Sequence, residues 1–353
     1  MQRAIVKTYG MWHSGYGVDG RESPAPRGRL PPWTITWAIK GIPPEGTSMT
    51  ILLTTPNGTV GRHPTDALRD REDVRHLVRS ASAAAALGPV RGEVVYGDAT
   101  DAAAVRAAVA GVDRLCLAHP FTEDQAAVET ALGLAALDAG ARRIVKLGAR
   151  PFTGSGTAPD AVTGAHDAVV ERLSAAGVPE LTVLRPDRFL QNFLPSAADI
   201  ADGTPADPAG PGARGYVDAR DIAAVAAAEL LAERPVGGGL DLSGPQALTL
   251  AELAGVFGTA LGRPVRYAAI PLDDAWRAGL LGRGMTPGVV EGLYGLYANY
   301  RREGVAGLGD GVRRVLGRPP LPAARFAAEV LVPAASRTRA VFENHRGRTP
   351  PRT

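Results

Sequence analysis

From residue 50 onward, short apolar runs alternate along the chain with segments whose apolar residues recur at helical spacing. The runs have no polar face, and such strands are typical of a parallel sheet covered by helices on both sides. The expected strands are residues 51–54, 74–78, 93–96, 112–117, 143–147 and 181–184. The expected helices are residues 59–69, 80–87, 101–110, 122–139 and 162–176. This alternation predicts an α/β fold with a doubly wound parallel sheet.

Capping signals support several of these helix boundaries. Residues 122–125 and 249–252 each match the capping box, in which a Thr and a Glu or Gln bond each other's backbone N–H groups. Gly140, Gly177 and Gly262 follow helical segments, as glycine does where a helix ends in the left-handed conformation.

Beyond residue 185 the pattern is less regular. Glycine and proline predict a loop at residues 202–212. Short strands are expected at residues 215–218, 240–242 and 265–270, and helices at residues 221–232, 249–262 and through most of 272–330. The predicted parts of the chain are a flexible extension (1–48), a doubly wound core (49–185), a smaller, mostly helical region that completes the same fold (186–330) and a disordered tail (331–353).

The turn after the first strand carries the main functional signal. A strand, a glycine turn and a helix N-terminus in this order bind a dinucleotide pyrophosphate, because small residues let it approach the backbone N–H groups. One glycine of the usual three is replaced by Thr55, and Pro56 removes a backbone donor. The residues expected at the cofactor are Thr55, Asn57, Gly58, Thr59, Val60 and Gly61. The same stretch also suits an ordinary strand–helix turn, and these residues alone leave both interpretations open.

Arg79 indicates which dinucleotide would bind. It ends the second strand about 20 residues beyond the glycine turn, where a site for NAD carries Asp or Glu. An arginine can instead bind a 2′-phosphate through charge-assisted hydrogen bonds. The sequence therefore predicts NADP(H), with a solvated arginine as the alternative in this arginine-rich chain.

Composition excludes several other classes of protein. The 353 residues contain one cysteine, Cys116, so an internal disulfide and a cysteine zinc cluster are excluded, and the histidines lack metal-site spacing. The net charge of +3 comes without a basic, aromatic-interleaved cluster, so no nucleic acid is expected as a partner. No apolar run approaches the roughly 20 residues that span a membrane, and the N-terminus lacks a signal-peptide core. A cytoplasmic protein without a membrane partner is expected.

Several segments, in order and at consistent spacing, resemble the NmrA-like family of atypical short-chain dehydrogenases/reductases over about residues 49–330. They are the glycine turn and residues 74–79, 94–98, 110–113, 144–147, 181–186, 216–218, 221–223, 242–249 and 316–319, with His166, Phe189 and Asn192. The resemblance implies a Rossmann-type core that binds NADPH or NADP+. Some members reduce quinones, azo compounds or other small carbonyls, whereas others are redox sensors. It also implies that Asp98 contacts the adenine amino group; a cap on the next helix is the alternative for Asp98.

Ordinary short-chain dehydrogenases use Tyr-x-x-x-Lys, in which the lysine lowers the pKa of the tyrosine for proton transfer. No tyrosine in this chain has a lysine four positions later, so another proton donor is needed. Lys146, near the end of the fifth strand, is the first candidate and is also expected at the nicotinamide ribose. His119 is the second, and Ala118 before it is expected to contact the cofactor through its backbone. His166 matches a family position, but packing within a helix is the favoured interpretation.

The substrate is expected between the carboxyl edge of the sheet and the C-terminal helices. The candidate lining residues are Phe189, Asn192, Phe193, Tyr216 and Trp276. The first hypothesis is an NADPH-dependent reductase of a small quinone or carbonyl-type substrate. The alternatives are an NADP(H)-binding sensor that acts through a protein partner, and a family member with non-redox chemistry. The sequence leaves a homodimer open.

Overall fold

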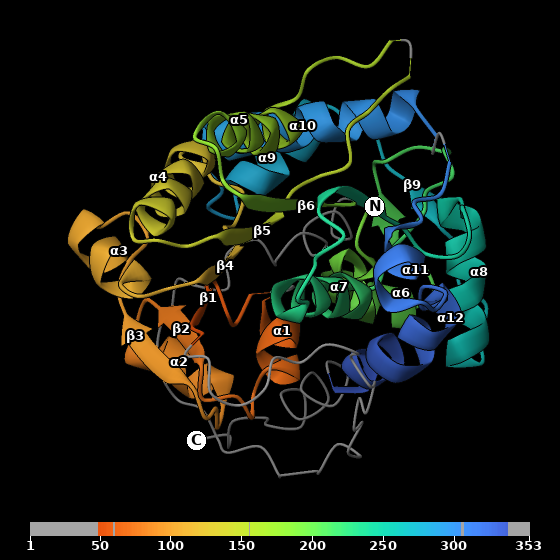
Figure 1. Ribbon diagram of the computed structural model, residues 1–353. Helices are drawn as coiled ribbons and strands as arrows, with labels where there is room; N and C mark the ends of the chain where they lie inside the picture. The colour runs from red at the N-terminus through yellow and green to blue at the C-terminus, as the bar shows by residue number, and fades with distance from the viewer. Residues whose placement is uncertain (1–48, 59–60, 155, 305–306, 338–353) are drawn as a thin grey trace, which may run out of the picture.

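The computed structural model describes residues 49–337 except 59–60, 155 and 305–306. A parallel sheet of seven strands runs through it in the order β3-β2-β1-β4-β5-β6-β8 (Figure 1). The strands are β1 (Ile51–Leu53), β2 (Val74–Val78), β3 (Glu93–Tyr96), β4 (Arg114–Leu117), β5 (Arg143–Leu147), β6 (Glu180–Pro186) and β8 (Gly238–Leu242). The order reverses between β1 and β4, which is where ligands of doubly wound sheets bind. The predicted Rossmann-type fold is therefore confirmed.

Helices cover both faces of the sheet, as the apolar strands require (Figure 1). Leu52 points to a cluster formed with α3 (Ala102–Val109), α4 (Gln125–Asp138) and α5 (Ala161–Ala175). Ile51 and Leu53 point to the opposite cluster, which includes α7 (Ala219–Leu231). The remaining helices beside the sheet are α1 (Arg62–Ala67), α2 (Ala81–Leu87) and α11 (Gly311–Leu316).

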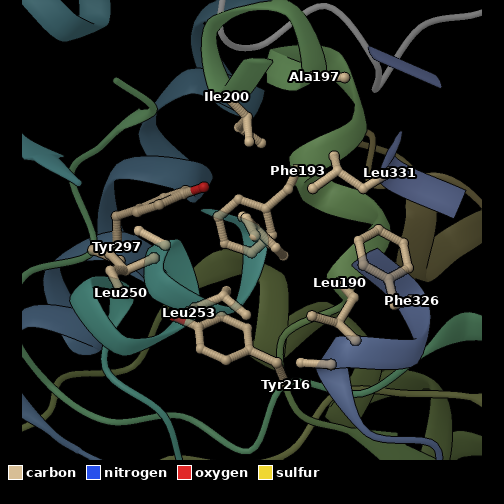
Figure 2. Close-up of a cluster of buried hydrophobic side chains, with 14 of the residues drawn as sticks. Leu190, Phe193, Ala197, Ile200, Tyr216, Leu250, Leu253, Tyr297, Phe326 and Leu331 are labelled. Atoms are coloured by element: carbon tan, nitrogen blue, oxygen red, sulfur yellow. The ribbon is translucent and has the colours of Figure 1, made fainter. Parts of the chain in front are cut away.

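The C-terminal part forms a second core beside the sheet (Figure 2). Its elements are the 3-10 helix η1 (Leu190–Ser196), α6 (Ala197–Ala201), β7 (Ala206–Asp207), α8 (Leu250–Leu261), β9 (Ala268–Ala269), α9 (Asp274–Leu281), α10 (Pro287–Arg302), α12 (Ala323–Phe326) and the π-helix η2 (Ala327–Leu331). The region is smaller and mostly helical, as predicted. None of the described helices has the length and apolar character needed to cross a membrane.

One strand prediction and one loop prediction in this region are wrong. Residues 215–218 form no strand: Val217 makes a single bridge to Phe189, and Asp218 caps α7 by accepting a hydrogen bond from the Arg220 backbone. The predicted loop at 202–212 contains β7, which pairs with the short β9. These strands are stabilised by tertiary packing, which local propensity does not report.

The capping box predicted at residues 122–125 is also absent. The helix α4 begins at Gln125, and its N-cap residue Asp124 makes no side-chain cap bond. The Gln125 side chain is buried and bonds Glu129 and His166 instead, so it is not available to the helix terminus. The second box forms as predicted: Thr249 and Glu252 bond each other's backbone at the start of α8.

The boundary of the predicted disordered tail is wrong by several residues. Residues 332–337 continue the helix after η2, and Leu331 and Ala335 are buried in the C-terminal core. Their apolar side chains fill this core, which the arginine-rich sequence beyond them concealed. Residues 338–353 and the predicted flexible extension at 1–48 lie outside the described part of the chain.

We expect a protein that begins at Met49 to fold with the stability of the full chain. The Met49 side chain packs against the core next to β1, which begins at Ile51, so this truncation keeps the first strand and its packing. Its thermal unfolding should stay cooperative, with a midpoint close to that of residues 1–353. A broad transition or a large fall in the midpoint would show that residues 1–48 belong to the folded unit.

Candidate functional site

The turn after β1 is tight and strained. Thr55, in the position of the missing glycine, has a φ of 46°, the one left-handed φ among the described non-glycine residues. This conformation costs a β-branched residue on the order of 1–3 kcal/mol. Hydrogen bonds hold the turn to the end of β4: the Thr55 hydroxyl donates to the Ala118 carbonyl at 3.2 Å, and the Thr54 hydroxyl donates to the same oxygen at 2.7 Å. The cofactor role predicted for Ala118 thus coincides with its role as an anchor of this turn.

Gly61 is the residue on which this turn depends most. A Cβ atom there would lie 2.0 Å from the Thr55 carbonyl oxygen, whereas one at Gly58 would lie 3.2 Å from it. The backbone therefore passes so closely at Gly61 that no side chain fits. Asn57 is exposed and donates a hydrogen bond to the Ala83 carbonyl on α2 at 3.3 Å. The other two residues predicted at the turn, Thr59 and Val60, lie outside the described residues.

Arg79 and Asp98 follow the neighbouring strands β2 and β3, by one and two residues. Arg79 is exposed and makes no hydrogen bond or ion pair with the described residues. The Asp98 carboxylate accepts hydrogen bonds from the Thr100 backbone and hydroxyl at 2.9 and 2.7 Å, and these bonds, with smaller effects of the Arg79 and His119 charges, lower the pKa of Asp98. The cap of α3 is Asp101, so Asp98 does not fill the alternative role considered for it.

Lys146 is fully buried rather than at the surface of a cleft. It extends from β5 toward α4 and α5, where its Nζ atom lies 2.9 Å from Glu129 Oε2 and 2.9 Å from His166 Nδ1. A third bond goes to the Leu147 carbonyl. Burial lowers the pKa of Lys146 from its usual range, and the neighbouring Glu129 opposes this shift. Lys146 itself is therefore not exposed to a ligand, whereas its partner His166 lines the cleft described below.

His119, the second predicted proton donor, follows β4. Its Nδ1 lies 2.9 Å from the Pro120 carbonyl, and burial lowers the pKa of the imidazole. It is half-buried but is not among the residues that line the cleft described next.

The cleft lies at the carboxyl ends of β5 and β6 and encloses about 180 Å³. Gly148 and Ala149, which follow β5, form one wall, and Pro186 and Asp187 at the end of β6 form another. The C-terminal end of α10 contributes Tyr300. This is the sheet edge on which the sequence analysis placed the substrate.

The predicted substrate residues divide into two groups. Phe189 and Asn192 line the cleft. Phe193, Tyr216 and Trp276 are buried in the C-terminal core, and Figure 2 shows Phe193 and Tyr216 among its packed side chains. These three side chains pack in that core and do not line the cleft.

The arginine and aromatic residues of the cleft were not predicted from the sequence. The buried guanidinium of Arg214 lies 4.5 Å from the Tyr300 ring centroid and 5.4 Å from that of Phe152. It donates hydrogen bonds to the carbonyls of Tyr300 and Glu303, and its Nε atom has no partner. Arg150 also lines the cleft, and its Nη1 lies 3.5 Å from Asp187 Oδ2. Arg150 and Phe152 lie three and five residues after β5, at the carboxyl edge of the sheet, a position that could have drawn attention to them.

His166 is the other residue whose place was not foreseen. It lies on α5, bonds Lys146 and Gln125 through Nδ1, and also lines the cleft. Burial and the charge of Lys146 hold its pKa well below the usual range, so the imidazole is neutral at neutral pH. No group of three or more metal-ligating side chains occurs in the described part of the chain.

Comparison with known proteins relates this architecture to a group of reductases. NAD(P)H azoreductase of Xenophilus azovorans is 34% identical over 285 residues, which cover 78% of this chain and 96% of that protein. A (4-alkanoyl-5-oxo-2,5-dihydrofuran-3-yl)methyl phosphate reductase of Streptomyces griseus is 33% identical over 285 residues, covering 79% and 97%.

A solved structure shares the fold, and a sequence family covers most of the chain. The structure of an NADPH-dependent quinone oxidoreductase of Escherichia coli, complexed with NADPH, superposes with a TM-score of 0.68 at 23% identity, covering 80% of this chain and 99% of that one. The sequence model of the NmrA-like family matches residues 47–300. The chain belongs to the NmrA-like family, because the family model covers most of it and because it aligns with 96% of a relative that is 34% identical.

Proposed function

We propose that this protein is an NADPH-dependent reductase that passes hydride directly to a small quinone or carbonyl-type acceptor. The observation that carries the proposal is the position of the cleft, which opens at the carboxyl ends of β5 and β6, on the same sheet edge as the glycine turn after β1. A dinucleotide held at that turn would extend along this edge toward the cleft. The names of the relatives, an NAD(P)H azoreductase and an NADPH-dependent quinone oxidoreductase, support the same chemistry.

The described residues fit the dinucleotide at two places. At Gly61 the start of α1 lies so close to the Thr55 backbone that no Cβ atom fits, as expected for the fingerprint glycine that packs the helix closely onto the turn. At the ends of β2 and β3, the exposed Arg79 would bind the 2′-phosphate and Asp98 the adenine. The bound nicotinamide would supply the hydride, and the residues of this chain would bind, orient and protonate the acceptor.

The cleft favours a planar, conjugated acceptor. Phe152 and Tyr300 offer aromatic rings, and the guanidinium of Arg214 lies against both. Flat molecules stack on such rings, and a guanidinium adds charge-assisted hydrogen bonds to an oxygen or nitrogen that gains electrons. Quinones, conjugated carbonyls and azo compounds share these properties.

Turnover with a panel of acceptors tests the proposal. Purified protein should oxidise NADPH when a quinone, an azo dye or a conjugated ketone is added, and it should do so more slowly with NADH. Formation of one hydroquinone or alcohol for each NADPH consumed would match the two electrons that a hydride carries. Absence of NADPH oxidation with all three classes of acceptor would refute the reductase proposal.

We expect Arg79→Ala to weaken NADPH binding about 10- to 100-fold, because charge-assisted bonds to a phosphate contribute about 1.5–3 kcal/mol. NADH lacks the 2′-phosphate, so its affinity should change little. Arg91→Ala is the matched control, because Arg91 is also exposed but precedes β3, at the opposite edge of the sheet. Titration of each variant with both nucleotides measures the effect, and an equal loss for NADPH and NADH would remove the role assigned to Arg79.

A second function is favoured by one observation, the strained Thr55. A turn held in a left-handed conformation at threonine would bind a dinucleotide less tightly than a glycine turn would. Such a site suits a regulator that responds to the NADP(H) level through a protein partner. NADPH binding without turnover of any acceptor would favour this function over the reductase.

A further inference from the structure

The buried pair of Lys146 and Glu129 calls for an explanation beyond stability. Lys146 lies on β5 and Glu129 on α4, and both side chains are fully buried at a separation of 2.9 Å. Figure 1 shows α4 and α5 together over this part of the sheet. Removing two charges from water costs several kcal/mol per ion, and apolar side chains of similar volume would stabilise the fold as well or better. Such a pair is therefore a candidate for function.

The hydrogen bonds of the pair determine the protonation of His166. The ammonium group of Lys146 has three donors, and its acceptors are Glu129 Oε2, the Leu147 carbonyl and His166 Nδ1. Gln125 Nε2 lies 3.2 Å from the same Nδ1 and 3.3 Å from Glu129 Oε2. Both neighbours of Nδ1 are donors, so Nδ1 must accept, and the proton of the neutral ring must reside on Nε2.

The His166 ring lies between the buried pair and the cleft. The Nδ1 edge of His166 faces the buried pair, while the residue itself lines the cleft next to Val162 and Thr163 of the same helix. The opposite edge of the ring, which bears the Nε2 proton, is therefore presented to a ligand. A neutral imidazole fixed in this way is a hydrogen-bond donor and a general acid.

We propose that His166 protonates the acceptor from Nε2, and that Lys146 and Glu129 are positioning residues that fix its tautomer and restore its proton. This inference rests on the proposed reductase function, and it assigns the role that Tyr-x-x-x-Lys fills in ordinary short-chain dehydrogenases. Neither Lys146 nor Glu129 touches the substrate.

Protons and electrons balance in the proposed reduction of the acceptor. Hydride from the reduced nicotinamide brings two electrons and one hydrogen to a neutral quinone, carbonyl or azo group, which leaves a negative charge on its oxygen or nitrogen. The Nε2–H bond of His166 then breaks, and the negatively charged oxygen or nitrogen of the acceptor takes the proton. As the Nε2 proton leaves, the Lys146 ammonium gives a proton to Nδ1, so the imidazole stays neutral. After product release, water protonates Nε2 and the Nδ1 proton returns to Lys146.

The first test reads the tautomer without any turnover. Nitrogen-15 NMR of histidine-labelled full-length protein, assigned with His166→Gln, should show an unprotonated Nδ1 and a protonated Nε2 for His166 from pH 6 to pH 8, a window of about one unit around neutrality. The double variant Lys146→Met/Glu129→Gln removes both buried charges. In it the ring-nitrogen resonances of His166 should show exchange between the two tautomers, and the imidazole should titrate nearer the ordinary pKa of histidine. A charged ring or an Nδ1–H tautomer in the unmodified protein would overturn the proposal even if no acceptor is reduced.

The second test measures proton transfer in turnover. His166→Phe should lower the single-turnover rate of quinone reduction about 100-fold, the usual contribution of a general acid, and abolish its solvent isotope effect, with NADPH affinity unchanged. Glu171→Gln, an exposed change on the same helix α5, is the control and should keep the full rate. An unchanged rate in His166→Phe would overturn the proposal, whereas no reduction by the unmodified protein would count against the reductase function and leave the NMR result to decide the tautomer.

Discussion

Gly61→Ala should raise the dissociation constant for NADPH about 30- to 150-fold, equivalent to about 2–3 kcal/mol. The added Cβ would lie 2.0 Å from the Thr55 carbonyl oxygen, a distance that no side chain can occupy. Thr55 cannot yield easily, because it already has a φ of 46° and is tied to Ala118 by its hydroxyl. The turn would therefore open and displace the first N–H groups of α1, which are proposed to bind the pyrophosphate.

Gly58→Ala is the matched control for this prediction. Its Cβ would lie 3.2 Å from the same Thr55 oxygen, so a shift of a few tenths of an ångström accommodates it. We expect its affinity for NADPH to stay within about threefold of the unmodified protein, or less than about 0.7 kcal/mol. Fluorescence titration of both variants makes the comparison. Equal affinities for Gly61→Ala and the unmodified protein would show that the dinucleotide does not bind at this turn.

Lys146→Met should destabilise the fold by about 3–5 kcal/mol, because it leaves the carboxylate of Glu129 buried without its partner. Glu129→Gln should destabilise the fold by a similar amount, because it leaves the Lys146 ammonium buried without its carboxylate partner. The double variant Lys146→Met/Glu129→Gln leaves no buried charge and should cost less than the sum of the two single changes. The free energy of unfolding from urea titration measures each step, and the double-mutant cycle yields the coupling between the pair.

An exposed ion pair provides the control for that cycle. Arg277 Nε lies 2.7 Å from Glu291 Oε1, but the Glu291 side chain is 60% exposed. Coupling between such groups is about 1 kcal/mol or less, because water screens the charges. If the coupling between Lys146 and Glu129 were as small as that between Arg277 and Glu291, water would reach the buried pair and the arrangement proposed for His166 would be wrong.

The sheet could be predicted from the sequence because its strands are apolar on both faces and alternate with helices. The period of the pattern placed β1 to β6 within a few residues. The short β9 lies within the strand expected at residues 265–270, but β7, in a segment expected to be a loop, could not be foreseen, since it has two residues and depends on pairing with a distant segment. The helical end at residues 331–337 was missed because its stability comes from packing of Leu331 and Ala335 into the C-terminal core.

The candidate site could be predicted only where it follows strand ends. Gly61, Arg79 and Asp98 are in positions that the order of strands determines, so the sequence places them at the carboxyl edge. The contact of Lys146 with Glu129 joins two elements, and no pattern in either one reports which side chains meet. The same applies to the arginine and aromatic residues of the cleft, which come from segments more than 50 residues apart.

The central claim is that the turn between β1 and α1, with Arg79 beside it, holds NADPH at the mouth of the cleft. Titration of the full-length protein with NADPH and NADH, followed by nicotinamide fluorescence, tests this claim most directly. The account predicts saturable binding of NADPH in the micromolar range, about −8 kcal/mol, and at least about tenfold weaker binding of NADH. Failure of either nucleotide to bind at millimolar concentration, or equal affinity for both, would contradict it.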